Sequence, residues 1–169
     1  MDGSSAHARL FLALWPDPAV RHLLTGWRDA WTWPRGASPV HADKLHLTLH
    51  FLGSLPRARL PALLDAFGVP FTPFHLALEH ATVWHNGIAV LEPAATPPEL
   101  AALHARLSEA LPTLGLQPET RHYRPHVTMA RRATGAIPPP EHPQVAWDVG
   151  GYALVESQDG VYSVLRRYG

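Results

Sequence analysis

Two short patterns of histidine, one hydrophobic residue and threonine recur far apart in the chain. They place His46 two positions before Thr48, and His126 two positions before Thr128. Successive side chains of a β-strand point to opposite faces, so each histidine would share a face with its threonine. The hydrophobic residues between and around them would anchor the other face in a core. Two such strands facing each other would gather two imidazoles and two hydroxyls around one small space.

This set of groups suits phosphoryl chemistry without a metal. An imidazole has an ordinary pKa near 6.5, so one of the two can be neutral while the other is protonated. The neutral imidazole can take a proton from water, and the protonated imidazole can give one to a leaving alkoxide. The threonine hydroxyls can donate hydrogen bonds to the phosphate oxygens on which negative charge develops.

A third match to the pattern, His80-Ala81-Thr82, warns that the pattern also occurs by chance. It comes just before Asn86-Gly87, a strong hairpin signal that would end its strand. We therefore expect this third match to be incidental, and replacement of His80 by alanine to leave any activity in place.

The elements that must position the motifs are a mixture of helices and strands. Asp17-Pro18 and Thr96 to Glu99 carry N-terminal helix signals, and leucines follow at helical spacing. The alternating segments, together with hairpin signals at Asn86-Gly87 and Asp159-Gly160, predict an α+β fold with mainly antiparallel sheets. A strand–helix–strand order in each half hints at an internal duplication. The predicted strands are 9–15, 44–51, 74–84, 88–91, 125–130, 145–155 and 161–165, and the predicted helices begin near 18, 60 and 98.

Composition limits the classes of function. The 169 residues are 46% hydrophobic and 17% charged, which is typical of a chain that builds a packed core. There are no cysteines, which excludes disulfides and a thiol nucleophile, and the 14 basic residues balance 14 acidic ones, unlike a duplex-DNA binder. No apolar stretch could span a membrane, and residues 1–5 lack a signal-peptide core. We expect a cytoplasmic monomer.

The sequence resembles the RNA 2′,3′-cyclic phosphodiesterases, also called 2′-5′ RNA ligases, of the 2H phosphoesterase superfamily. The resemblance covers nearly the whole chain and rests on four segments, each with the expected neighbours of a family motif. These segments are Arg9-Leu-Phe-Leu-Ala13, Asp43-Lys-Leu-His-Leu-Thr-Leu-His-Phe-Leu-Gly53, Tyr123-Arg-Pro-His-Val-Thr-Met-Ala-Arg131 and Tyr162-Ser-Val-Leu165.

The resemblance implies a single bilobal domain over residues 1–169, with two similar lobes of mainly antiparallel sheet around a central cleft. It implies that His46 is the proton donor to the leaving oxygen and His126 the proton acceptor from water. Thr48, Thr128 and Arg131 would bind the phosphate. The reaction would open a 2′,3′-cyclic phosphate to a 2′-phosphate, and a 5′-hydroxyl in place of water would give a 2′-5′ linkage. No metal or cofactor is implied, and the partners would be single-stranded RNA ends or small cyclic nucleotides.

Other residues near the motifs leave open questions. Arg131 lies an odd number of positions from His126, so the strand must end or bulge if Arg131 is to reach the cleft. His50 shares the predicted face of His46, either as a third polar group in the cleft or at an exposed strand end. The aromatic residues near strand ends, which could stack on bases or belong to the core, are Phe11, Trp84 and Tyr123. The densest basic cluster, which is either a solvated face or a phosphate contact, is Arg121, Arg124, Arg131 and Arg132.

Two alternative functions follow from the same residues. A non-catalytic module that binds RNA ends or nucleotides would keep the site and lose turnover. A zinc hydrolase could use His46 and His50 as ligands, although no His-Glu-x-x-His pattern is present. Product formation distinguishes the first alternative, and sensitivity to chelators distinguishes the second.

Overall fold

A computed structural model describes residues 6–169, and this part of the chain forms a mixture of short helices and strands. Residues 1–5, in which we expected no signal-peptide core, lie outside the described residues. Among the described residues, no helix has both the length and the apolar character needed to cross a membrane. In chain order the elements are β1 (His7–Leu14), α1 (Pro18–Asp29), β2 (Ser38–Pro39), η2 (Ala42–Lys44), β3 (Leu47–Pro56), η3 (Arg57–Arg59), α2 (Leu60–Ala66), β4 (Phe74–Leu78), β5 (His80–Val83), β6 (Ala89–Glu92), α3 (Pro98–Thr113), β7 (Val127–Arg131), β8 (Val145–Val149), β9 (Tyr152–Gln158) and β10 (Val161–Tyr168).

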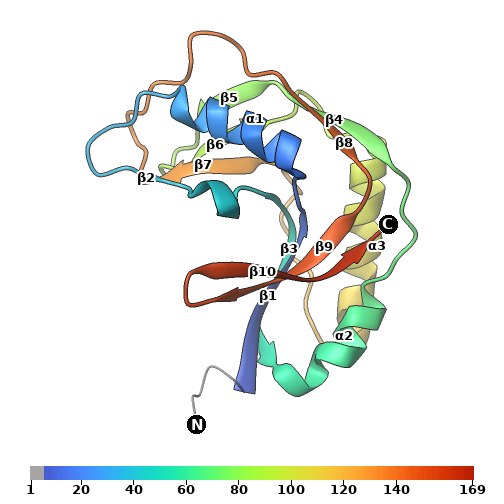
Figure 1. Ribbon diagram of the computed structural model, residues 1–169. Helices are drawn as coiled ribbons and strands as arrows, with labels where there is room; N and C mark the ends of the chain where they lie inside the picture. The colour runs from blue at the N-terminus through green and yellow to red at the C-terminus, as the bar shows by residue number, and fades with distance from the viewer. Residues whose placement is uncertain (1–5) are drawn as a thin grey trace.

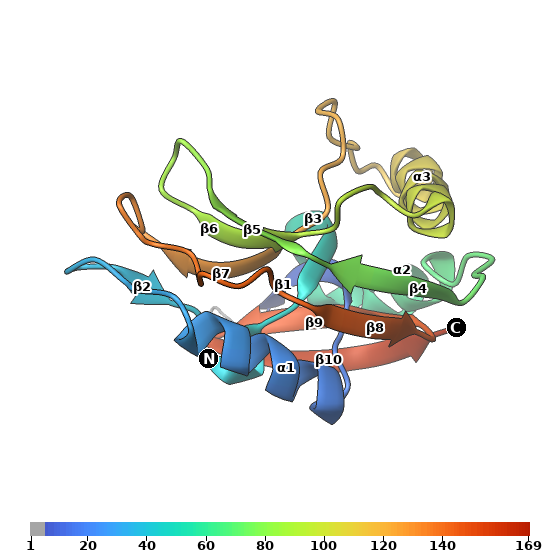
Figure 2. The ribbon, with the colours of Figure 1, turned by 90° about the horizontal axis from the view of Figure 1, so that it is seen from above.

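Most strands form one curved sheet, in the order β10-β9-β1-β3-β7-β6-β5, and β2 adds to it beside β7 (Figure 1). Strands β4 and β8 pair separately, and every pairing is antiparallel. Helix α3 contacts β3, whereas α1 contacts β8, and the two helices lie on opposite sides of the strands (Figure 2). The predicted α+β class with antiparallel sheets is confirmed.

The two halves of the large sheet repeat one arrangement. In the first half, β1 and β3 flank α1 in the sequence and pair with each other. In the second half, β6 and β7 flank α3 and also pair with each other. Strands β3 and β7 then join the halves through a single residue pair, Leu47 with Val127. Each His-x-Thr motif therefore begins where the two halves meet.

Local sequence signals account for most helix and turn positions. The Asp17 side chain accepts a hydrogen bond of 2.8 Å from the backbone N–H of Val20, as predicted for the start of α1. The signal from Thr96 to Glu99, which has the pattern of a capping box, is wrong about the cap, because Pro97 is the N-cap of α3 and makes no side-chain capping bond. Asp159 and Gly160 have φ angles of 51° and 77°, which is the conformation of the predicted tight hairpin turn.

Two of the predicted strands are each two strands. The segment predicted over 74–84 breaks at Glu79, where the chain leaves β4 in one sheet and enters β5 in the other. The segment predicted over 145–155 breaks at Gly150 and Gly151, between β8 and β9. A Cβ atom at Gly151 would collide with the carbonyl oxygen of Tyr168, so this crossing requires glycine. Hydrophobic patterning alone does not show a strand that changes sheets.

Candidate active site

The two His-x-Thr motifs meet on one face of the large sheet. Leu47 and Val127 pair across the two strands and are fully buried. Because side chains alternate, the residues on either side of this pair point to the opposite face. Those residues are His46, Thr48, His126 and Thr128. The predicted meeting of two imidazoles and two hydroxyls follows from this one ladder pair.

The His46 imidazole is held at both nitrogens. Its Nδ1 lies 2.6 Å from the carbonyl oxygen of Lys44, which can only accept a hydrogen bond, so Nδ1 carries the proton. Its Nε2 lies 2.8 Å from the Thr48 hydroxyl. In the neutral ring Nε2 has a lone pair, so the hydroxyl donates to it. The free protein therefore presents the ring with an unprotonated Nε2 and a fixed orientation.

His126 repeats the same local arrangement. Its Nδ1 donates to the carbonyl oxygen of Arg124 at 2.9 Å, again two residues earlier, which leaves Nε2 available. The Arg124 side chain is held by the carboxylate of Glu92 at 2.6 and 3.0 Å. The Trp84 ring meets the His126 ring edge to face, with centroids 4.4 Å apart. Both histidines are thus oriented by the backbone carbonyl two residues earlier in the chain.

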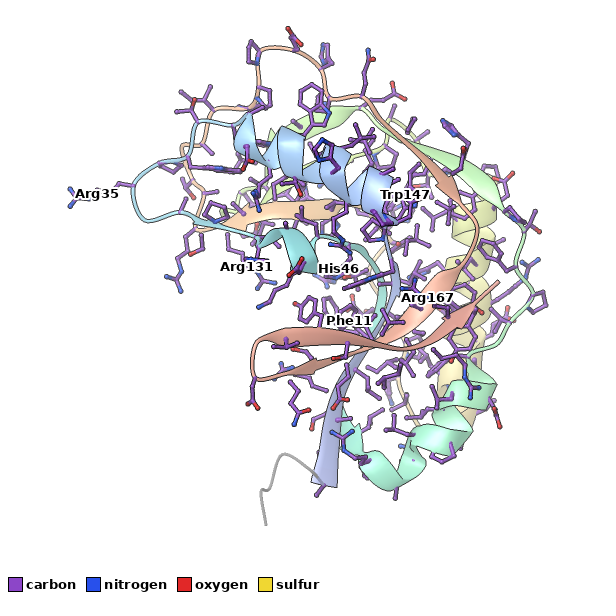
Figure 3. The ribbon with its side chains drawn as sticks, viewed as in Figure 1. Phe11, Arg35, His46, Arg131, Trp147 and Arg167 are labelled. Carbon is purple, nitrogen blue, oxygen red and sulfur yellow. The ribbon has the colours of Figure 1, made fainter. Side chains whose placement is uncertain are left out.

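An aromatic wall surrounds His46 on the sheet. The ring centroids of Phe11, Tyr162 and Trp15 lie 4.8, 5.7 and 5.9 Å from that of His46. Figure 3 shows Phe11, His46 and Arg131 between β7 and the β9–β10 hairpin. The proposed stacking of a base on Phe11 is wrong, because only 4% of Phe11 is exposed. Phe11 supports the histidine ring from the sheet.

Arg21 of α1 also holds the segment that precedes His46. Its Nη1 donates to the carbonyl oxygens of Ala42 and Leu45, at 2.5 and 3.0 Å. Its guanidinium lies 4.9 Å from the Trp15 ring centroid, as in a cation–π contact. The sequence analysis missed this residue, because a helical arginine gives no sign of which backbone it will reach.

Burial lowers the pKa of both histidines. For His46 the pKa falls to about 4: burial is the main cause, the hydrogen bond to Lys44 opposes it, and the positive charge of Arg21 lowers it further. His126 and Arg131 also act electrostatically on His46 in this direction. The pKa of His126 is also lowered by burial, which the hydrogen bond to the Arg124 carbonyl opposes. At neutral pH both rings are neutral in the free protein.

A β-bulge brings Arg131 to the site face. Val90 pairs with Thr128 and Ala89 with Ala130, so Met129 is an extra residue in β7. The bulge reverses the alternation of side chains that follow it, and Arg131 emerges exposed on the face of Thr128. The condition that the strand must end or bulge before Arg131 is met.

A bulge in β3 turns His50 away from the face of His46. Ala13 pairs with Thr48 and Leu12 with His50, so Leu49 is the extra residue. His50 is only 4% exposed and its Nε2 lies 3.0 Å from the carbonyl oxygen of His104 in α3. The expectation of an exposed strand end is wrong, because His50 is buried against α3, from where it lines the cavity that also contains Thr48 and His126. The zinc pairing with His46 fails for the same reason, because the two rings are on opposite faces.

Tyr123 serves as a brace between the two motifs. Its ring stacks on that of His104 at 3.8 Å, and its hydroxyl donates to the carbonyl oxygen of Thr48 at 3.0 Å. Burial raises the pKa of Tyr123. One face of the Tyr123 ring is covered by His104, so Tyr123 supports the first motif. Tyr123 also lines the cavity beside Thr48 and His126, and its stacking on a base stays a prediction.

Trp84 borders an open cavity beside the two motifs. It is half-buried and lines a cavity of about 290 Å³ together with Thr48 and His126. Phe51, which the sequence analysis did not select, lines the same cavity and is 66% exposed. The bulge in β3 is the reason it was missed, since regular alternation would turn Phe51 away from Thr48.

The predicted basic cluster divides into two kinds of arginine. Arg121 pairs with Glu119 at 2.8 Å, and Arg124 pairs with Glu92. In residues 6–169 no carboxylate lies within ion-pair distance of Arg131 or Arg132. Within this cluster, only Arg131 and Arg132 therefore carry a positive charge that no carboxylate in the described part of the chain neutralises.

The third His-x-Thr match lies elsewhere. His80 is on β5 at the edge of the sheet, beside a separate groove lined also by Glu79 and His142. Within the part of the chain that the structure describes, no three metal-ligating side chains of histidine, cysteine, aspartate or glutamate are grouped around one point.

Comparison with known proteins agrees with this geometry. Residues 15–160 match the family described as the 2′-5′ RNA ligase superfamily. The RNA 2′,3′-cyclic phosphodiesterase of Escherichia coli (strain K12) is 35% identical over 136 residues, which cover 78% of this chain and 77% of the relative. The protein of the same name from Thermus thermophilus is 31% identical over 179 residues, covering 95% of this chain and 89% of the relative.

Solved structures show the same fold. The crystal structure of E. coli LigT complexed with 3′-AMP has a TM-score of 0.84 at 29% identity, over 95% of this chain and 97% of that one. The crystal structure of TT0787 of Thermus thermophilus has a TM-score of 0.74 at 29% identity, over 94% and 96%.

Proposed function

The chain belongs to the 2′-5′ RNA ligase superfamily, and we propose that it hydrolyses 2′,3′-cyclic phosphate ends of RNA to 2′-phosphates by acid–base catalysis with His46 and His126. The observation that carries this proposal is the Leu47–Val127 pair, which puts both imidazoles and both threonines on one face. Each imidazole keeps Nδ1 on a backbone carbonyl and turns Nε2 toward the chemistry.

The proposed reaction uses His126 as the base and His46 as the acid. Nε2 of His126 takes a proton from water, whose oxygen forms a new bond to phosphorus. The bond from phosphorus to the 3′-oxygen breaks, and Nε2 of protonated His46 gives its proton to that oxygen. The products are a 2′-phosphate and a free 3′-hydroxyl, and solvent returns the proton from His126 to His46.

The substrate must help to protonate His46. With a pKa of about 4, its ring is neutral in the free protein at pH 7. A phosphodiester anion beside Arg131 and the two histidines would oppose the positive charges that act on His46 and raise its pKa. Once Nε2 carries a proton, the Thr48 hydroxyl is released from it and can donate to a phosphate oxygen. Thr128 would do the same from the second strand.

Several finer statements belong to the same proposal. A 5′-hydroxyl in place of water would give a 2′-5′ linkage by the same bond changes. The partners would be single-stranded RNA ends or small cyclic nucleotides, with Trp84 as a stacking surface for a base. Every proposed group comes from one chain, so the protein would act as a monomer. It would be a single bilobal domain and would work in the cytoplasm.

The test is turnover of a short RNA that ends in a 2′,3′-cyclic phosphate, with EDTA present. We expect a 2′-phosphate product from the wild type, and a rate lower by about 10²–10⁴-fold in His46→Ala and in His126→Ala. The matched control is His80→Ala, which removes the histidine of the third His-x-Thr match and should keep the wild-type rate.

The alternatives are distinct outcomes of this test. Loss of turnover in EDTA, restored by zinc, would favour a zinc hydrolase. Binding of the cyclic end without product would favour a non-catalytic module. Turnover that survives both histidine substitutions would refute the two-histidine mechanism.

A further inference from the structure

Two carboxylates are buried in the described part of the chain, and Glu92 is the one that lies beside the second motif. It ends β6, which pairs with β7. Its carboxylate accepts hydrogen bonds from Nε and Nη2 of Arg124, at 2.6 and 3.0 Å. A buried ion pair contributes little net stability relative to well-packed hydrophobic residues. The position of this pair next to His126 therefore calls for a reason other than stability.

The Arg124 backbone lies outside the strands of the sheet. Strand β7 begins at Val127, and residues 122–126 have no regular secondary structure. The Arg124 carbonyl nevertheless accepts the Nδ1 proton of His126 at 2.9 Å, which fixes the tautomer and the direction of that ring. Because Arg124 is not part of a strand ladder, the ion pair of its side chain with Glu92 anchors this carbonyl to β6.

Arg124 also supports the His126 ring from the side. Its guanidinium lies 4.6 Å from the ring centroid of Trp84, and the Trp84 ring meets the His126 ring edge to face at 4.4 Å. Glu92 thus reaches His126 by two routes, the Arg124 carbonyl and the Trp84 ring. Both routes pass through the Arg124 side chain.

The first half of the molecule holds His46 in a related way. Arg21 lies over Trp15, 4.9 Å from its ring centroid, and donates to carbonyls of the segment that precedes His46. The Trp15 ring in turn stacks on the His46 ring at 5.9 Å. The two halves differ in what each arginine binds, because Arg21 donates to neutral carbonyls and Arg124 to a charged carboxylate. The positive charge beside the proposed base is therefore balanced by its own ion pair.

The charges around His126 agree with the role of a base. Burial is the main cause that lowers its pKa, the Arg124 carbonyl and the charge of Glu92 oppose this, and the charge of Arg124 adds to it. His46, the other titratable group of the site, interacts electrostatically with His126. A base whose pKa is kept closer to neutrality takes a proton from water more readily.

We propose that Glu92 is a positioning residue for the proposed base, and that its ion pair with Arg124 holds the carbonyl that orients the His126 ring. This inference rests on the proposed function and adds a residue outside both motifs to the groups that serve it. Glu92 acts through Arg124 and is not itself a catalytic residue.

The experiment breaks the ion pair from each side. Glu92→Gln removes the carboxylate, Arg124→Gln removes the guanidinium, and kcat and KM are measured on 2′,3′-cyclic AMP. The two changes shift the charge near His126 in opposite directions, so a loss common to both reports positioning. We expect each to lower kcat by about 10- to 100-fold, the range seen when the partner that orients a metal-ligating histidine is removed, and to change KM less. The double variant should lose no more than the larger single loss, because the two residues act as one unit.

Glu156→Gln is the matched control. The Glu156 side chain is also 9% exposed and lies 2.6 Å from Arg57, but it belongs to β9. Its replacement breaks a buried ion pair of the same kind away from His126. It should leave kcat and KM unchanged.

A spectroscopic measurement separates positioning from stability. Nitrogen chemical shifts of the His126 ring, recorded by NMR in the free protein, report which ring nitrogen carries the proton. The wild type and Glu156→Gln should carry it on Nδ1. Glu92→Gln should show a mixture of the two tautomers.

Equal losses of kcat in Glu92→Gln and Glu156→Gln would show a merely structural role and overturn the inference. Additive losses in the double variant, or a higher kcat in Arg124→Gln, would overturn it too. If Glu92→Gln does not fold, the double variant, which leaves neither charge unpaired, decides in its place. If the wild type does not turn over cyclic AMP, the proposed function fails. The inference is then judged by NMR alone, and an unchanged Nδ1 tautomer in Glu92→Gln would refute it.

Discussion

The proposed reaction makes a specific prediction about pH. Acid–base catalysis by two histidines requires one proton on the pair in total, whichever ring holds it. In the free protein the pKa of His46 is about 4, and that of His126 is lowered from its ordinary value of 6.5. Above pH 6.5 the form with one proton is therefore a minority. Its share decreases as the pH rises.

The magnitude follows from the titration. Above the higher of the two pKa values, the singly protonated fraction falls about tenfold for each pH unit. Because kcat/KM reports the free enzyme, it should fall about 100-fold between pH 7 and pH 9. The substrate's negative charge raises the pKa of the protonated imidazole in the complex, so the decline in kcat should begin at a higher pH.

The assay is the initial rate on 2′,3′-cyclic AMP from pH 5 to pH 9 at constant ionic strength, with both kcat and kcat/KM extracted. His80→Ala serves as the control and should reproduce the wild-type profile. A value of kcat/KM that stays constant between pH 7 and pH 9 would contradict the reasoning, because it would require a reaction without a titrating proton on the pair.

Two further substitutions test how the histidines are held. Arg21→Gln should raise the pKa of His46 above about 4, since burial still lowers that pKa but the Arg21 charge no longer does. Titration of the His46 ring by NMR measures this in the absence of substrate, with Arg28→Gln as a control on the same helix. Tyr123→Phe removes the hydroxyl that donates to the Thr48 carbonyl. It should lower the free energy of unfolding by about 1 kcal/mol, measured by urea titration, and an unchanged value would show that the bond contributes nothing.

Structural features that depend on residues close together in the sequence could be predicted. Hairpin and N-cap residues located the Asp159–Gly160 turn and the start of α1 because their side chains and φ angles act on neighbouring backbone. The meeting of the two motifs could also be predicted, because in a strand the histidine and threonine of His-x-Thr share one face while their hydrophobic neighbours are buried on the other. The resemblance to a known family supplied the roles. Such patterns could not predict that β4 and β5 belong to different sheets, because the sheet that a strand joins depends on residues far away in the sequence.

The errors about which residues share a face share one physical cause. The parity argument treats β3 and β7 as regular strands, in which His50 faces with His46 and Arg131 faces away from His126. Each strand instead carries an extra residue directly after the motif threonine. A bulge increases local twist and re-aims the side chains that follow.

The position of the two bulges explains why they are repeated. Strands β3 and β7 pair at a single point and continue with different partners, β1 and β6. Strong twist immediately after the threonines lets the strands diverge there, while the histidines before them stay together. The divergence opens the cavity at Thr48 and His126, and the same change of parity places Phe51 in its lining, while Arg131 emerges on the face of Thr128 outside that lining. The arrangement of the histidines and the cavity beside them thus both depend on the same irregularity, a β-bulge after the motif threonine, which occurs once in β3 and once in β7.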